Sequence, residues 1–366
     1  MSMFGAVAQA LGRASPAQTG LRGDALSRDV LQGAKASTAS TASTASTAAA
    51  GSAQALAGAE AAKPVLQLNP FPVTLRPLDY ANPLSSGNPG GSLAALWAFR
   101  QLVDPVPEFS TYYAASMAST ESVYRLIAGG ASLVGANPFV ASVIADAQRA
   151  VAAAQAYPNL DHTLGNWLPV LATPGDWSTD IAAYSDLEID LAGPDSGNGA
   201  FTVLGHSRTD LSLNIGASVP LGLAATRGVS AAAGGVARTQ AVGRGTSLRG
   251  VKMKYQTISL GRPWFSAMLF SLSGWTLAGQ PPGFCSSGDL VHNPGILPLI
   301  PSELLVATAV EVDGAWGAAD QPWVDAAQAG TSSLAVGPFP VGQAARGASI
   351  HVIGWVSSFV PRSPQG

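Results

Sequence analysis

Residues 186–191 read Asp-Leu-Glu-Ile-Asp-Leu, and this alternation of acids with aliphatic residues decides the fold class. Successive side chains of a strand point to opposite faces of a sheet, so the pattern predicts a strand with one solvated and one buried face. Residues 251–256 read Val-Lys-Met-Lys-Tyr-Gln and alternate in the same way. Both stretches therefore predict strands of a mostly antiparallel sheet.

Further strand candidates are short and bounded by glycine, proline or other turn residues. They are Phe201–Leu204, Asp210–Ile215, Val251–Leu260 (the second stretch extended), Leu304–Val312, Ser333–Val336 and Ala348–Phe359. Several short strands separated by such turns are typical of a sandwich or a barrel-like sheet. A repeated strand–turn–helix rhythm is missing from the sequence, which argues against a doubly wound fold.

Residues 92–157 carry the helical signal. Apolar residues at spacings of three and four predict helices over 92–103, 110–128 and 138–156. Ser92 is a candidate N-cap of the first, and Met117 lies on the expected apolar face of the second. Pro138 suits the first turn of the third. The three segments predict one small helical layer.

The N-terminal segment, 1–63, has the composition of a low-complexity arm. Residues 1–35 show a weak helical pattern, and Ala36–Thr47 is four copies of Ala-Ser-Thr, which is typical of a flexible linker. Residues 64–90 contain six prolines between apolar residues, so we expect an extended segment across the surface of the following domain.

These observations predict an α+β fold: a helical layer followed by a mostly antiparallel β-sandwich or barrel-like sheet, with a disordered N-terminal arm. The expected organisation is an N-terminal arm at 1–63, an extended proline-rich and helical region at 64–178, and a β-rich domain at 179–366.

The composition indicates a chain with a large core and little surface charge. Hydrophobic residues make up 47% of the 366 residues and charged residues only 11%, against roughly 25% in a typical domain. A surface so poor in charge is often covered by another chain. The alternative is a monomer coated in small polar residues.

Charge is sorted along the sequence. Residues 161–210 hold eight acids and one base, residues 211–288 hold seven bases and no acid, and residues 289–325 hold six acids and no base. Opposite blocks of this kind can pair within the chain or between copies.

The basic block and the aromatic residues after it are the candidate partner-binding residues: Arg227, Arg238, Arg244, Arg249, Lys252, Lys254, Arg262, Trp264 and Trp275. An anionic membrane surface is an alternative partner. Nucleic acid is disfavoured, because stacking aromatics and a larger basic excess are missing. The two tryptophans also fit a buried core corner, with Arg262 able to lie over an indole face.

Asp186, Glu188 and Asp190 place three carboxylates about 7 Å apart on one strand face, and oxygen ligands suit calcium. The alternative is a solvated face or a partner for the basic block. No cofactor is expected, because Gly243-Arg-Gly245 lacks the Lys-Ser/Thr of a phosphate loop.

A hydrolase on a sandwich scaffold is a second alternative. Gly205-His206-Ser207 begins like a nucleophile elbow, but Thr209 stands where the second glycine is required. Asp210 and His206 lie too close in sequence to Ser207 for an ordinary triad.

Two uncharged stretches, 126–145 and 263–288, raise a membrane-acting protein of pore-former type as another alternative. Glycine and proline inside both stretches favour core instead. The single cysteine, Cys285, excludes an intrachain disulfide. The N-terminus lacks a basic region before its apolar residues, so we expect a cytoplasmic protein, or one exported without a classical signal peptide.

The leading hypothesis is a non-catalytic structural or interaction protein. It would self-assemble or dock on a protein partner through the sorted charge blocks.

Overall fold

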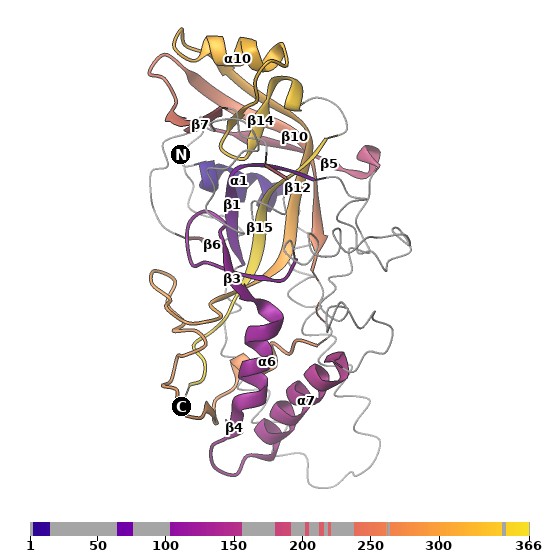
Figure 1. Ribbon diagram of the computed structural model, residues 1–366, viewed down its shortest axis with the longest axis vertical. Coiled ribbons are helices and arrows are strands. Elements are labelled where there is room, and N and C mark those ends of the chain that lie inside the picture. The colour runs from indigo at the N-terminus through magenta and orange to yellow at the C-terminus, as the bar shows by residue number, and fades with distance from the viewer. Residues whose placement is uncertain are drawn as a thin grey trace.

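The protein is mostly β, with a large antiparallel sheet at its centre (Figure 1). The computed structural model describes residues 3–14, 64–75, 103–155, 180–191, 202–204, 212–215, 219–220, 238–260, 262, 264–345 and 349–365. The predicted β-rich character and antiparallel sheet are thus confirmed, whereas closure into a sandwich or a barrel stays a prediction, as do the domain boundaries.

Five antiparallel strands form the large sheet in the order β5, β10, β12, β15, β1. Two short strands, β6 and β8, pair with β1 in parallel. The strands are β1 (Val65–Leu75), β5 (Ser185–Asp190), β6 (Thr202–Val203), β8 (Val219–Pro220), β10 (Ser247–Ser259), β12 (Leu299–Ala315) and β15 (Ile350–Phe359).

The two alternating stretches that opened the sequence analysis form β5 and the middle of β10, and these strands are direct neighbours. Val251, Met253 and Tyr255 are buried, whereas Lys252 is exposed and Lys254 is half-buried. Each pattern therefore gave the correct face. The register shifts between Leu248 and Gly250, where β10 carries one extra residue against β12.

Strand β1 corrects the expected surface position of the proline-rich segment. It lies inside the sheet between β15 and the short parallel strands, and Val65, Leu66 and Leu68 are fully buried. Its ladder with β15 shifts register between Leu68 and Val73, and both prolines of the strand lie in that interval. A proline cannot donate to a ladder, so the irregularity lets a proline-rich strand occupy an interior position.

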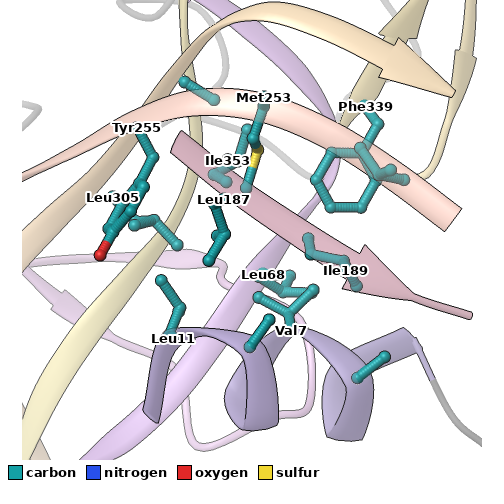
Figure 2. Packing of buried hydrophobic residues seen from close by; sticks show 14 of the residues in the cluster. Val7, Leu11, Leu68, Leu187, Ile189, Met253, Tyr255, Leu305, Phe339 and Ile353 are labelled. Atoms are coloured by element: carbon teal, nitrogen blue, oxygen red, sulfur yellow. The ribbon is translucent and has the colours of Figure 1, made fainter. Parts of the chain in front are cut away.

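Helix α1 (Met3–Ala14) corrects the predicted arm at its very start. Figure 2 shows it packed beneath the sheet, with Val7 and Leu11 directed at side chains of β5, β10 and β12. Val7 is fully buried and Leu11 is 4% exposed. Burying an aliphatic side chain contributes about 1.5–3 kcal/mol. The rest of the arm, residues 15–63, lies outside the described residues.

A second core lies at the other end of the molecule, around α6 (Thr120–Gly130) and α7 (Pro138–Gln155) (Figure 1). The prediction of a helix at 138–156 is confirmed. The predicted helix at 110–128 is wrong over its first half, where β3 (Ala115–Ser119) stands. Ser119 caps α6, since its side chain accepts a hydrogen bond from the Ser122 amide. The predicted helix at 92–103 falls almost wholly outside the described residues.

Three smaller sheets complete the described strands. The elements not yet given are β2 (Pro105–Pro107), β4 (Ala131–Leu133), the 3₁₀ turn η3 (Ile181–Ala183), β7 (Ser212–Ile215), β9 (Arg238–Ala241), α9 (Met268–Ser271), β11 (Trp275–Leu277), α10 (Gln321–Gln328), β13 (Leu334–Val336), β14 (Phe339–Val341) and the 3₁₀ turn η4 (Gly342–Ala345). Strands β2 and β3 form a pair, β4 and β11 another, and β14, β13, β7 and β9 form a third sheet.

Asp320 pins the β9–β10 turn against the start of α10. Its buried carboxylate accepts hydrogen bonds from the Gly243 amide at 2.7 Å and the Thr246 hydroxyl at 2.6 Å. The Thr246 hydroxyl oxygen in turn accepts from the Gly317 amide. The closed set of partners satisfies a carboxylate that would otherwise be costly to bury.

The described residues contain no helix that is long and apolar enough to cross a membrane. The uncharged stretch at 126–145 is divided among the end of α6, strand β4 and the first turns of α7. The stretch at 263–288 includes α9 and β11. Short elements joined by turns, rather than one long helix, thus account for the apolar character of both.

We expect Leu11→Ala to lower the free energy of unfolding by about 2–5 kcal/mol, because it removes a buried side chain from the contact between α1 and the sheet. Urea denaturation measures the loss. Ala14→Ser, at an exposed position of the same helix, serves as the matched control and should change stability by less than about 0.5 kcal/mol. Equal stability of both variants would contradict the docked position of α1.

Candidate functional site

The basic block pairs with both acidic blocks of its own chain. Strand β10 lies between β5, which belongs to the first acidic block, and β12, which belongs to the second. Three ion pairs cross these two junctions: Lys252–Glu188 at 3.6 Å, Lys254–Asp186 at 3.0 Å and Arg249–Asp313 at 2.9 Å. We call this row the charge ladder.

The charge ladder faces solvent, so its contribution to stability is small. The side chains of Lys252 and Glu188 are 61% and 73% exposed, and solvent-exposed pairs contribute about 0–1 kcal/mol each. Like charges directly opposite one another on neighbouring strands are destabilising. The ladder therefore favours the register in which β10 pairs with β5, more than it adds net stability.

The other predicted basic residues are placed differently. Arg244 is exposed in the turn between β9 and β10. The backbone of Arg238 begins β9, and Arg227 lies outside the described residues.

The calcium hypothesis gains no support from the geometry. Among the described residues, no group of three or more His, Cys, Asp or Glu side chains is gathered closely enough to hold a metal ion. Asp186 and Glu188 instead face lysines of β10. The alternative of a solvated face that partners the basic block describes these carboxylates.

Trp264 and Trp275 correct the prediction of a partner-binding pair, because both are buried. They are 2% and 0% exposed and lie in the core around α6 and α7. Tyr124 of α6 packs against Trp264, with ring centroids 5.5 Å apart. The tryptophans form a core corner and cannot meet a partner in this structure.

Arg262 is also an internal residue. Its guanidinium donates hydrogen bonds to the carbonyl oxygens of Pro301 in β12 and Val103, which precedes β2. Burial lowers the pKa of Arg262 to about 10, while Asp104 opposes that shift. This side chain therefore ties the segment that leads into β2 to the sheet, instead of lying on the surface.

The candidate nucleophiles have separate fates. Ser207, His206 and Asp210 lie outside the described residues. Cys285 is fully buried, and burial raises the pKa of its thiol to about 12. A thiol must ionise to act as a nucleophile, so Cys285 is chemically protected in the folded chain.

An apolar groove of about 580 Å³ lies between the β2–β3 pair, α6 and the loop 293–298. Leu126 lines it from α6, on a different side of the helix from the buried Tyr124 and Ile127. Glu108 is the charged member among the described lining residues. The remaining described lining is mostly apolar: Val106, Pro107, Phe109, Ala118, Val123, Pro294, Ile296 and Pro298, with Ser116, Ser122, Asn293 and Gly295.

Met117 stands on the rim of this groove, between the lining residues Ser116 and Ala118. Pro105 and Pro107 of β2 pair with Ser119 and Ala115 of β3, so β3 carries extra residues in this interval. Such a bulge re-aims the side chains at its apex. Met117 is accordingly 93% exposed.

A second apolar projection precedes the other wall of the groove. Leu290 and Val291 are 44% and 91% exposed, in the turn just before the lining residues Asn293 and Pro294. The Asp289 carboxylate accepts the Val291 amide at 2.7 Å, and the Asn293 side chain accepts the Ser287 amide at 2.9 Å. These bonds hold the turn in one shape. The hydrogen bond from Val291 also lowers the pKa of Asp289.

We call the groove, with Met117, Leu290 and Val291, the groove face. The sequence interpretation missed it, because it assigned Met117 to a buried helical face. The N-cap at Ser119, directly before Thr120, was the signal that could have placed the helix start after Met117. The Asx-type turn at Asp289 was a second signal.

Comparison of the chain with protein-family models, curated proteins and solved structures finds no match. The functional argument therefore rests on the geometry of the charge ladder and the groove face.

A double-mutant cycle should measure the strength of the charge ladder. We expect Lys254→Met and Asp186→Asn to couple by about 0.2–1 kcal/mol in urea denaturation, as exposed pairs do. At 1 M salt, where the Debye length is about 3 Å, the coupling should vanish. Lys254→Met with Asp325→Asn, a carboxylate on α10, supplies the uncoupled control. A coupling energy well above the expected range would contradict the view that the ladder mainly favours register.

Folded protein should react with a thiol reagent such as DTNB far more slowly than protein unfolded in urea. The reason is that Cys285 is buried and its pKa is raised to about 12, so the thiolate population is negligible near neutral pH. Comparable rates in the two conditions would show that Cys285 is accessible.

Proposed function

We propose that this chain is a non-catalytic protein that associates with a second copy of itself, and that the groove face is the docking surface. The observation that carries the proposal is the meeting of concave and projecting apolar surface on one face. A groove of about 580 Å³ is flanked by Met117 and Val291, which are 93% and 91% exposed.

Exposed apolar side chains of this size are costly unless another surface covers them. Single exposed hydrophobic residues are ordinary, but apolar residues gathered around an apolar groove mark interaction sites. Methionine also adapts its shape to a partner surface, since its side chain is unbranched and polarizable. The fixed turn at Leu290 and Val291 adds a projection that loses little conformational entropy on binding.

A second copy is the occupant that this geometry favours. In a two-fold dimer the same patch meets itself, so each projection of one subunit faces the groove of the other. The groove face supplies both halves of such a contact. The low charge of the chain, 11% of residues, agrees with a surface that is partly covered in the assembled state.

The charge blocks play a different part from the one expected from the sequence. We infer that docking depends on the groove face rather than on sorted charge, because three cations of the basic block already pair within the chain. The described groove also carries one charged lining residue, Glu108, whereas a catalytic pocket needs several convergent polar groups. Docking is therefore the better use of this surface.

Substitutions on the groove face should shift the native mass toward that of the monomer, 36.9 kDa. We expect Met117→Glu and Leu126→Glu each to weaken self-association at least tenfold, about 1.4 kcal/mol, since a charge would be buried against apolar surface. Size-exclusion chromatography with light scattering over a concentration series measures the effect.

Phe139→Glu provides a matched control. Phe139 is 46% exposed on α7 and does not line the groove, so its replacement should leave the native mass unchanged. A wild-type chain that remains monomeric at every concentration, or one whose association is insensitive to both groove substitutions, would overturn the proposal.

A further inference from the structure

The surface of the large sheet beneath α1 is shaped to receive this helix. Leu68, Leu187, Ile189 and Met253 line it together with Leu305 and Ile353 (Figure 2). Gly337, at φ +54°, closes one end, where an added Cβ atom would lie 2.9 Å from the terminal methyl carbon of Met3. We call this surface the α1 slot. Its fit includes a glycine that leaves room for one particular side chain of the helix.

Helix α1 behaves as a ligand of this slot. Met3, Val7 and Leu11 recur every four residues and are all buried, which is the pattern of a helix laid into a groove. The helix has only 12 residues and includes two glycines, Gly5 and Gly12. Helices this short are marginal in water, and each glycine costs about 1 kcal/mol relative to alanine. Docking in the slot is therefore what stabilises the helix.

The connection between α1 and the rest of the fold is long. Residues 15–63 separate Ala14 from the residue before β1, and they include the Ala-Ser-Thr repeats. Flexible linkers of this length have a root-mean-square reach of roughly 40 Å. The covalent connection therefore does not dictate whether α1 docks in its own slot or in that of a neighbouring subunit.

Effective concentration decides between these two arrangements. A flexible tether holds α1 near its own slot at a concentration of about the millimolar range, so a dilute monomer keeps the helix in its own slot. In a dimer the slot of the other copy is held nearby at a concentration of the same order.

We propose that α1 of one copy docks in the α1 slot of the other within the self-associated protein, so that the slot is a second interaction surface whose ligand is residues 3–14 of another copy. This exchange rests on the proposed self-association, which supplies the proximity.

Cross-linking of two differently tagged full-length chains tests the exchange. One chain carries Arg13→Cys at the exposed end of α1, and the other carries Asp190→Cys at the end of β5. Both positions line one cavity in the docked arrangement. A bis-maleimide reagent can join the two chains across this cavity when α1 of the first occupies the slot of the second. The native Cys285 is buried and can be left in place.

The matched control replaces Asp190→Cys with Arg149→Cys, whose parent side chain is 74% exposed on α7, at the opposite end of the molecule from α1 (Figure 1). We expect at least tenfold more mixed cross-linked product with Asp190→Cys than with Arg149→Cys. Introducing Leu126→Glu into both chains should reduce that product to the control level at micromolar protein.

The outcomes separate the two proposals. A dimer in light scattering with equal yields from Asp190→Cys and Arg149→Cys would overturn the exchange and leave the groove proposal standing. Selective cross-linking that persists in Leu126→Glu chains would support exchange of α1 and overturn its dependence on the groove face. Monomeric protein without selective product would overturn both.

Discussion

The large sheet depends on the position of β10 between β5 and β12. One face of β10 presents Val251, Met253 and Tyr255 to the core, and α1 packs on that side. The other face presents Lys252 and Lys254 to the acids of β5. Because a shift of one residue would exchange these faces, burial and cross-strand charge together favour one register. The apolar face supplies most of the stability, whereas the exposed pairs contribute little and act on alignment.

The two ends of the chain complete this sheet. Strand β1 pairs with β15, which comes from the opposite end of the sequence, and α1 covers the buried face. Neither element carries a strong signal of its own: α1 is short and contains two glycines, and β1 contains two prolines. Both are stabilised by surfaces that exist only after the remaining strands have assembled. A fold built in this way leaves its N-terminal helix attached through packing more than through chain connectivity.

Local patterns predicted the elements whose stability is decided locally. Alternation identified β5 and the core of β10, and Pro138 with its apolar spacing identified α7. Long-range contacts explain the errors. Pro70 and Pro72 argued against an interior strand, yet the register shift between Leu68 and Val73 accommodates them. The groove face was invisible for the same reason, since its hairpin and helix meet a loop that comes from a distant part of the sequence.

The sequence by itself determined the antiparallel, β-rich character and the side of β5 and β10 that faces the core, because these follow from the alternation of adjacent side chains. It also determined that opposite charges were available in separate blocks. Only the tertiary structure decided that Lys252 and Lys254 meet Glu188 and Asp186 of the same chain, that Trp264 and Trp275 are buried, and that Met117 is exposed. The physical reason is that pairing and burial depend on which distant segments become neighbours, and residue order alone does not specify those contacts.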